Sequence, residues 1–153
     1  MSSLKFNKKA LFVVVIALTI AFIWSNSLKV ADASMEQSNF IKELVLSFFA
    51  FFGIDLENTF FIDFIRKFAH FFEYFVLGFE LVIYKCIYHK NSKKAFVVTM
   101  LIGVLVACVD ESIQLIPSLG RSGEIVDVCI DSAGVILAFL IISVFSKLRN
   151  IKN

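Results

Sequence analysis

The sequence predicts an all-α membrane protein with four transmembrane helices and an additional amphipathic helix on the membrane surface. Composition, the length of the apolar stretches and the distribution of charge lead to this fold class. Of the 153 residues, 59% are hydrophobic, and the chain contains 19 Phe but only one Pro. Soluble domains contain about 45–50% apolar residues even when Gly is counted. The composition therefore predicts one integral membrane domain over residues 1–153.

Four stretches of the chain are long and apolar enough to cross a bilayer. A span needs about 20 mainly apolar residues, because about 30 Å of hydrocarbon is crossed at about 1.5 Å per helical residue. The stretches that meet this requirement are about 10–28, 67–86, 95–116 and 125–146. With four spans, the two termini lie on the same side of the membrane.

The basic residues indicate which side that is. Ten of the 15 Lys and Arg residues lie in three segments without any acidic residue: the N-terminus (Lys5, Lys8, Lys9), residues 85–94 (Lys85, Lys90, Lys93, Lys94) and the C-terminus (Lys147, Arg149, Lys152). Short loops rich in Lys and Arg stay on the cytoplasmic side of a cell membrane. We therefore expect cytoplasmic termini. Because orientation explains these charges, the sequence does not predict nucleic-acid binding.

The first apolar stretch has an alternative interpretation as a cleaved signal peptide. It has a basic start, an apolar run from Ala10 to Trp24, and a small-x-small cleavage site at Ala31-Asp32-Ala33. Trp24 and the polar residues after it also suit a retained helix that ends at the membrane interface. We favour retention. Cleavage would leave three spans and would not move the other loops across the membrane.

The segment of about 29–66 is predicted to contain the amphipathic helix, at about 35–52. Ser34 and Gln37 fit a capping box at its start. The apolar residues that follow form one stripe at helical spacing: Phe40, Ile41, Leu44, Val45, Phe48, Phe49 and Phe52. Polar residues lie opposite this stripe, which favours a helix on the outer leaflet. A fifth span is the alternative, but it would no longer leave all the basic segments on the cytoplasmic side.

Polar residues gather near the predicted outer ends of the last three spans. The second span begins with Arg66, Lys67, His70, Glu73 and Tyr74, whose spacing places them on one side of a helix. The third span ends with Asp110, Glu111 and Gln114, and the fourth begins with Glu124, Asp127 and Asp131, after Arg121 in the loop. Three helices therefore bring polar faces to one level, which predicts a wet cavity open to the outer leaflet.

A purely structural interpretation competes with this cavity. One charge at the centre of a span costs about 2.5–3.5 kcal/mol, so such residues persist where they meet one another or water. Ion pairs between the helices would satisfy that need. The carboxylates outnumber the fixed cations, so a proton, a metal ion or a cationic ligand is a further candidate partner. No metal site or cofactor is predicted, because the second histidine, His89, lies in the basic loop.

Catalysis has weaker support in the residues. One His beside several carboxylates permits acid–base chemistry. No activated Ser or Cys accompanies it, since the three cysteines, Cys86, Cys108 and Cys129, lie within the spans or at their ends and suit packing. An ion or proton pathway is disfavoured, because the inner halves of the spans contain few polar residues.

These polar motifs resemble the VanZ-like family of small bacterial membrane proteins. The matching motifs are Arg66-Lys67-x-x-His70-Phe-x-Glu73-Tyr74, Leu77-Gly78, Asp110-Glu111-x-x-Gln114, Gly120-Arg121-Ser122-Gly123, Asp127-Val128-x-x-Asp131 and Gly134. They cover residues 66 to about 140, and Trp24-Ser25 also suits the family. Where relatives have Pro-Gly-Arg, this chain runs from Pro117 to Arg121 with two more residues.

The resemblance implies a multi-pass protein of the bacterial cell membrane, in a family whose named member is associated with teicoplanin resistance. We expect glycopeptide resistance through a site that engages an envelope lipid, a cell-wall precursor or the lipoglycopeptide itself. The candidate ligand-binding residues are Arg66, Lys67, His70, Glu73, Tyr74, Asp110, Glu111, Gln114, Arg121, Asp127 and Asp131. The alternative is a membrane enzyme that modifies a lipid or cell-wall precursor, with His70 and a carboxylate as the acid–base pair.

Overall fold

The computed structural model describes residues 8–29, 31–51, 60–88, 92–120 and 123–151. Within these ranges the chain is helical and contains no strand. The helices are α1 (Lys8–Ser27), α2 (Ala31–Phe51), α3 (Phe60–Tyr88), α4 (Ser92–Gln114), the short 3-10 helix η1 (Pro117–Leu119) and α5 (Ile125–Ile151). The predicted all-α class is confirmed.

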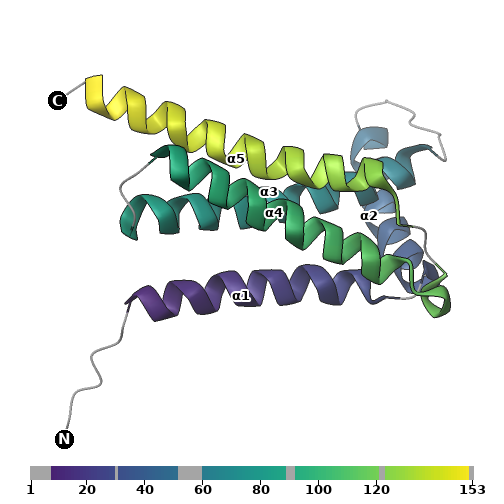
Figure 1. Ribbon diagram of the computed structural model, residues 1–153. Coiled ribbons are helices and arrows are strands. Elements are labelled where there is room, and N and C mark those ends of the chain that lie inside the picture. Colours follow the sequence, from purple (N-terminus) through teal and green to yellow (C-terminus); the bar gives the residue numbers. More distant parts are fainter. Residues whose placement is uncertain (1–7, 30, 52–59, 89–91, 121–122, 152–153) are drawn as a thin grey trace, which may run out of the picture.

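Four of the helices form an up-and-down bundle. α1, α3, α4 and α5 run along a common direction, and each is antiparallel to the one before it (Figure 1). α3 is the central helix, because it packs against α1, α2, α4 and α5. The start of α1 and the end of α5 lie at the same end of the bundle, and α2 runs across the opposite end (Figure 1).

Three helical segments within the described ranges are long and apolar enough to cross a membrane: Lys8–Ser27, Phe96–Gln114 and Ile125–Ser146. They coincide with three of the four predicted spans. α3 covers the fourth, about 67–86, but its apolar character is interrupted by Lys67, Glu73, Glu80 and Lys85. A crossing by α3, and with it the four-span topology, therefore stays a prediction.

Two glycines allow α3 and α5 to approach closely. A Cβ atom on Gly78 would lie 2.8 Å from the Cα of Val135, and one on Gly134 would overlap the carbonyl oxygen of Phe71. Any side chain at these positions would push the two backbones apart. Small residues are used in this way at helix contacts inside membranes.

α1 is an integral part of the bundle. Its side chains Ile16, Ile23 and Ser27 are buried, and the indole N–H of Trp24 donates a hydrogen bond to the Val106 carbonyl of α4 at 3.4 Å. Retention of the first span, as opposed to its cleavage, stays a prediction.

Large apolar side chains cover the outside of the bundle. Leu11, Leu18, Leu101, Leu105, Leu140 and Phe145 are all exposed. A soluble protein rarely exposes so much contiguous apolar surface, whereas a bilayer covers it.

α2 lies where the amphipathic helix at about 35–52 was predicted. Phe40, Leu44 and Phe48 of its apolar stripe are exposed, and Phe52, the last residue of the stripe, lies outside the described residues. A stripe of exposed aromatic and aliphatic side chains is typical of a helix that rests on a bilayer. Placement of α2 on a membrane surface stays a prediction.

Candidate functional site

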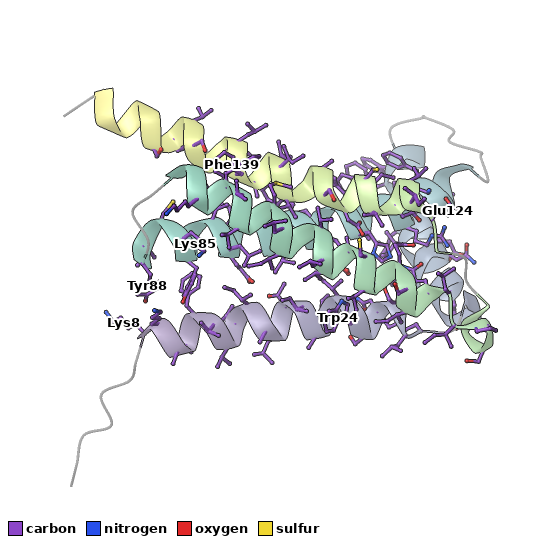
Figure 2. The ribbon with its side chains drawn as sticks, viewed as in Figure 1. Lys8, Trp24, Lys85, Tyr88, Glu124 and Phe139 are labelled. Carbon is purple, nitrogen blue, oxygen red and sulfur yellow. The ribbon has the colours of Figure 1, made fainter. Side chains whose placement is uncertain are left out.

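The polar side chains of three helices meet near the end of the bundle that α2 crosses. We call this set the polar cluster: Lys67, His70, Glu73 and Tyr74 of α3, Asp110, Glu111 and Gln114 of α4, and Glu124, Asp127 and Asp131 at the start of α5. Figure 2 places Glu124 toward this end, with Lys8, Lys85 and Tyr88 toward the other.

An ion pair forms the outer part of the polar cluster. The Lys67 ammonium donates to Asp127 Oδ1 at 2.6 Å and to Glu124 Oε2 at 3.5 Å. The side chains of Lys67 and Asp127 are only 30% and 16% exposed, so solvent screens this pair weakly. The pair therefore ties α3 to the beginning of α5.

A network around Gln114 connects α4 to its neighbours. The Gln114 amide nitrogen lies 3.2 Å from Glu111 Oε1, 3.4 Å from Asp110 Oδ2 and 3.4 Å from the hydroxyl oxygen of Ser27. The other carboxylate oxygen of Glu111 accepts the Glu124 backbone N–H at 2.8 Å. A negative charge at this position also stabilises the N-terminus of α5. These buried residues therefore have a structural role of their own.

The innermost part of the polar cluster combines His70 with two buried aspartates. His70 Nδ1 lies 3.7 Å from Asp110 Oδ2, and ligand atoms of His70, Asp110 and Asp131 all lie within 4.8 Å of one another. Asp110 and Asp131 are fully buried. Neither carboxylate oxygen of Asp131 has a hydrogen-bond partner among the described residues, and the same is true of the buried Tyr74 hydroxyl.

Two further residues of the predicted site are the arginines. Arg66 is on α3 and half-buried, whereas Arg121 lies outside the described residues. The residues from Pro117 to Leu119 form η1. This turn closes when Gly120, at a φ of 63°, donates its N–H to the Pro117 carbonyl at 3.2 Å.

Sequence reasoning missed three polar residues of α1. Asn26 donates from Nδ2 to Glu73 Oε1 at 2.7 Å, and Ser27 is buried beside Gln114. Farther along α1, the Thr19 hydroxyl donates to Glu80 Oε1 at 3.0 Å. The sequence did contain a signal for such a contact. Glu80 interrupts an apolar stretch, and a carboxylate in that position needs a partner on another helix.

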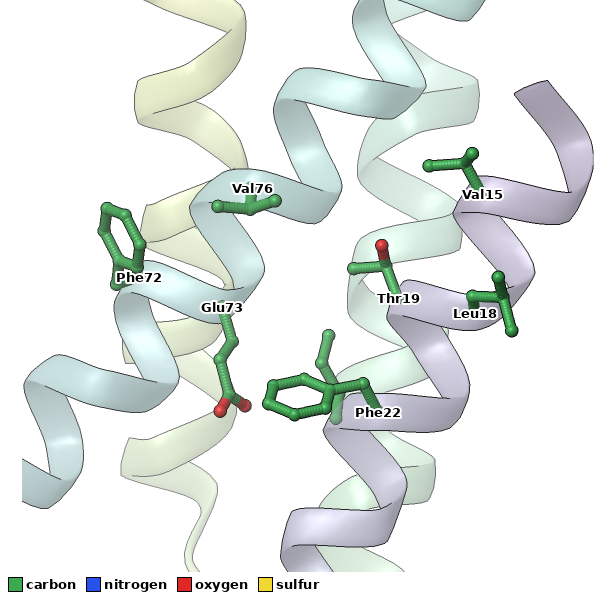
Figure 3. Close-up of a pocket in the computed structure, with 8 residues that line it drawn as sticks. Val15, Leu18, Thr19, Phe22, Phe72, Glu73 and Val76 are labelled. Atoms are coloured by element: carbon green, nitrogen blue, oxygen red, sulfur yellow. The ribbon is translucent and has the colours of Figure 1, made fainter. Parts of the chain in front are cut away.

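An apolar groove between α1 and α3 reaches the polar cluster. Its volume is about 400 Å³, and its lining consists of Val15, Leu18, Thr19, Phe22, Ile23, Phe72, Glu73 and Val76. Glu73 is the charged member of this lining, and its carboxylate lies across the groove from the Phe22 ring (Figure 3). This groove is apolar, with Glu73 at one end, and so it is not the polar cavity that the sequence predicts. The polar cavity stays a prediction.

The comparison with protein families matches residues 12–146 to the VanZ/LLP1 family. The chain belongs to the VanZ/LLP1 family. The match begins in α1 and ends in α5, so it contains the groove and the whole polar cluster. No curated protein and no solved structure matches the chain. Family membership and the apolar helices together identify a VanZ-like membrane protein.

Proposed function

We propose that this VanZ/LLP1 protein binds an amphiphilic molecule of the bacterial envelope at the outer leaflet of the cell membrane. The ligand class comprises envelope lipids, lipid-linked cell-wall precursors and lipoglycopeptides such as teicoplanin. The observation that carries this proposal is the apolar groove between α1 and α3, which ends at Glu73 beside the polar cluster.

The groove suits a hydrocarbon chain that enters from the bilayer. Leu18, Phe22 and Phe72 line it and are 65%, 58% and 54% exposed, so its mouth is on the outer surface of the bundle. Its volume of about 400 Å³ falls within the range of about 300–1,000 Å³ that is typical of small-molecule sites. An acyl chain in the groove would remain in apolar surroundings throughout.

The polar end of the groove suits a hydrogen-bonding headgroup. Glu73 and Asn26 are joined there at 2.7 Å. Lys67 lies six residues earlier on α3, about 9 Å nearer the end of the bundle at about 1.5 Å per residue. A headgroup next to Glu73 would therefore lie at the level of the polar cluster, while the Lys67 ammonium stays directed toward Asp127 and Glu124 at the start of α5.

The proposed orientation puts this end of the bundle outside the cell. In the four-span topology, the basic segments at the other end are cytoplasmic. α2 would then rest on the outer leaflet, with its exposed side chains Phe40, Leu44 and Phe48 in contact with lipid.

The role in glycopeptide resistance is tested by the minimum inhibitory concentrations of teicoplanin and vancomycin in a susceptible Gram-positive host. Wild type is compared with His70→Ala, Asp127→Ala and Leu18→Trp at matched amounts in the membrane. We expect selective protection against teicoplanin, with all three variants losing it. Leu140→Trp adds the same bulk to an exposed position of α5 and should retain protection. A well-expressed wild type without protection would contradict the resistance role.

Ligand binding is tested separately from resistance. The protein is purified in a mild detergent. The lipids that remain bound to it are then extracted and quantified by mass spectrometry. Leu18→Trp fills the groove and should retain fewer lipids than wild type, whereas Leu140→Trp should match wild type. Equal lipid retention by wild type and Leu18→Trp would contradict the groove as the binding site.

An enzyme is the second candidate function, favoured by the distance of 3.7 Å between His70 Nδ1 and Asp110 Oδ2. This pair places a group that titrates near neutrality beside a carboxylate, as acid–base chemistry on a lipid or cell-wall precursor requires, but at more than hydrogen-bond distance. The candidate predicts a new product when labelled membrane lipids are incubated with wild type, and no product with His70→Ala. Unchanged lipids and precursors after overexpression would reject it in favour of binding alone.

A further inference from the structure

Three side chains from three different helices converge inside the bundle. His70 of α3, Asp110 of α4 and Asp131 of α5 each offer a ligand atom, and these atoms lie within 4.8 Å of one another. Around a tetrahedral ion with bonds of about 2.1 Å, the ligand atoms are about 3.4 Å apart. The distance from His70 Nδ1 to Asp110 Oδ2 is 3.7 Å. Small side-chain rotations would bring the three groups onto one ion.

Asp131 lacks the partner that its burial requires. Its side chain is completely buried, and neither of its oxygens has a hydrogen-bond partner among the described residues. A buried carboxylate without a partner is costly, because it has lost its hydration and gained nothing in return. Lys67 cannot supply the compensating charge from its present position, since its ammonium contacts Asp127 and Glu124.

A single divalent cation would account for all three groups at once. One doubly charged ion neutralises the carboxylates of Asp110 and Asp131 together, whereas one proton neutralises a single carboxylate. A cation also explains why an imidazole nitrogen faces the two carboxylates, because imidazole is a common metal ligand. We propose that His70, Asp110 and Asp131 bind one divalent transition-metal ion, with Zn²⁺ as the expected occupant.

The donor set determines the class of metal. One imidazole and two carboxylates suit Zn²⁺ or Mn²⁺, whereas Mg²⁺ and Ca²⁺ prefer sites made of oxygen alone. Gln114 supports the site from behind, because its amide nitrogen lies 3.4 Å from Asp110 Oδ2 and orients that carboxylate. Tyr74 is one turn from His70, and its buried hydroxyl is available to a metal-bound water.

This site does not depend on the proposed ligand of the groove. The absence of a second histidine from the polar residues led to the sequence-based expectation of no metal site. In the structure, Asp131 from another helix takes the place that a second histidine would have filled.

The test measures the metal itself. The full-length protein, purified in detergent, is stripped with a chelator, incubated with micromolar Zn²⁺ and desalted, and its zinc is quantified by inductively coupled plasma mass spectrometry. We expect about one Zn²⁺ per wild-type chain and at least a tenfold loss in Asp131→Asn and His70→Ala. Mg²⁺ and Ca²⁺ in excess should not displace the zinc.

The control is Glu80→Gln, which removes a partly buried carboxylate of α3 that is paired with Thr19 rather than placed in the metal site. It should retain zinc like wild type. Zn²⁺ should also raise the thermal unfolding temperature of wild type and Glu80→Gln, but not that of Asp131→Asn. Failure of folded wild type to retain zinc would overturn the proposal, even if a variant did not fold. Equal zinc in wild type and Asp131→Asn would overturn it as well.

Discussion

Lys67 and Asp127 are 60 residues apart in the sequence, yet the Lys67 ammonium and Asp127 Oδ1 lie 2.6 Å apart between α3 and α5. The same ammonium is 3.5 Å from Glu124 Oε2. This contact places the two helices in one register at the end of the bundle that contains the polar cluster.

Loss of this ion pair should lower stability. Lys67→Ala leaves the partly buried Asp127 without its cation, and we expect a loss of about 1.5–3 kcal/mol, as for hydrogen bonds to charged groups. The measurement is thermal unfolding in detergent, with a double-mutant cycle that includes Asp127→Ala. Lys85→Ala, at the other end of α3, is the control and should have little effect. A coupling energy of zero would show that the pair contributes nothing.

The close packing of α3 against α5 leaves no room for a side chain at position 134. Gly134→Val forces the two backbones apart, and we expect a destabilisation of about 1–3 kcal/mol, as for other overpacked sites. Ala133→Val changes the neighbouring residue, which is exposed, and should be close to neutral. Thermal unfolding and size-exclusion profiles of both variants check this prediction. Equal stability of the two variants would show that the helices separate without cost.

The Thr19–Glu80 hydrogen bond should stabilise the contact between α1 and α3. Thr19→Val removes the donor and leaves the Glu80 carboxyl without this partner, at an expected cost of about 1–3 kcal/mol. Glu80→Gln retains a group that accepts from Thr19 and should cost less. The comparison is made by chemical or thermal unfolding of both variants. A larger loss in Glu80→Gln than in Thr19→Val would contradict this assignment.

The proposed topology predicts opposite labelling of the two ends of the bundle. In a variant whose three cysteines are replaced by serine, Ser118→Cys in η1 should react with a membrane-impermeant maleimide in intact cells. Lys94→Cys, near the start of α4, should react only after the cells are permeabilised. Both positions are exposed, so accessibility within the protein does not separate them. The reverse labelling pattern would show that the protein has the opposite orientation. Labelling of both positions in intact cells would show that α4 does not cross the membrane.

Much of the fold follows from the sequence, because the hydrocarbon interior of a bilayer permits few backbone structures. A chain inside a bilayer must satisfy its own backbone hydrogen bonds, so long apolar stretches become helices. This reasoning placed the apolar segments of α1, α4 and α5 to within a few residues. Helical periodicity also identified Lys67, His70 and Glu73 as polar residues near one end of α3.

Other features were decided by tertiary structure alone. Helical periodicity determines which residues share a face, but it does not determine how far one helix rotates or slides against another. That relation is set by close packing, such as the contact of α3 and α5 at Gly78 and Gly134. It pairs Lys67 with Asp127, places Asn26 beside Glu73, and leaves Asp131 buried without a hydrogen-bond partner among the described residues. The sequence by itself thus determined the helices and their polar faces, whereas packing between helices decided which polar groups meet.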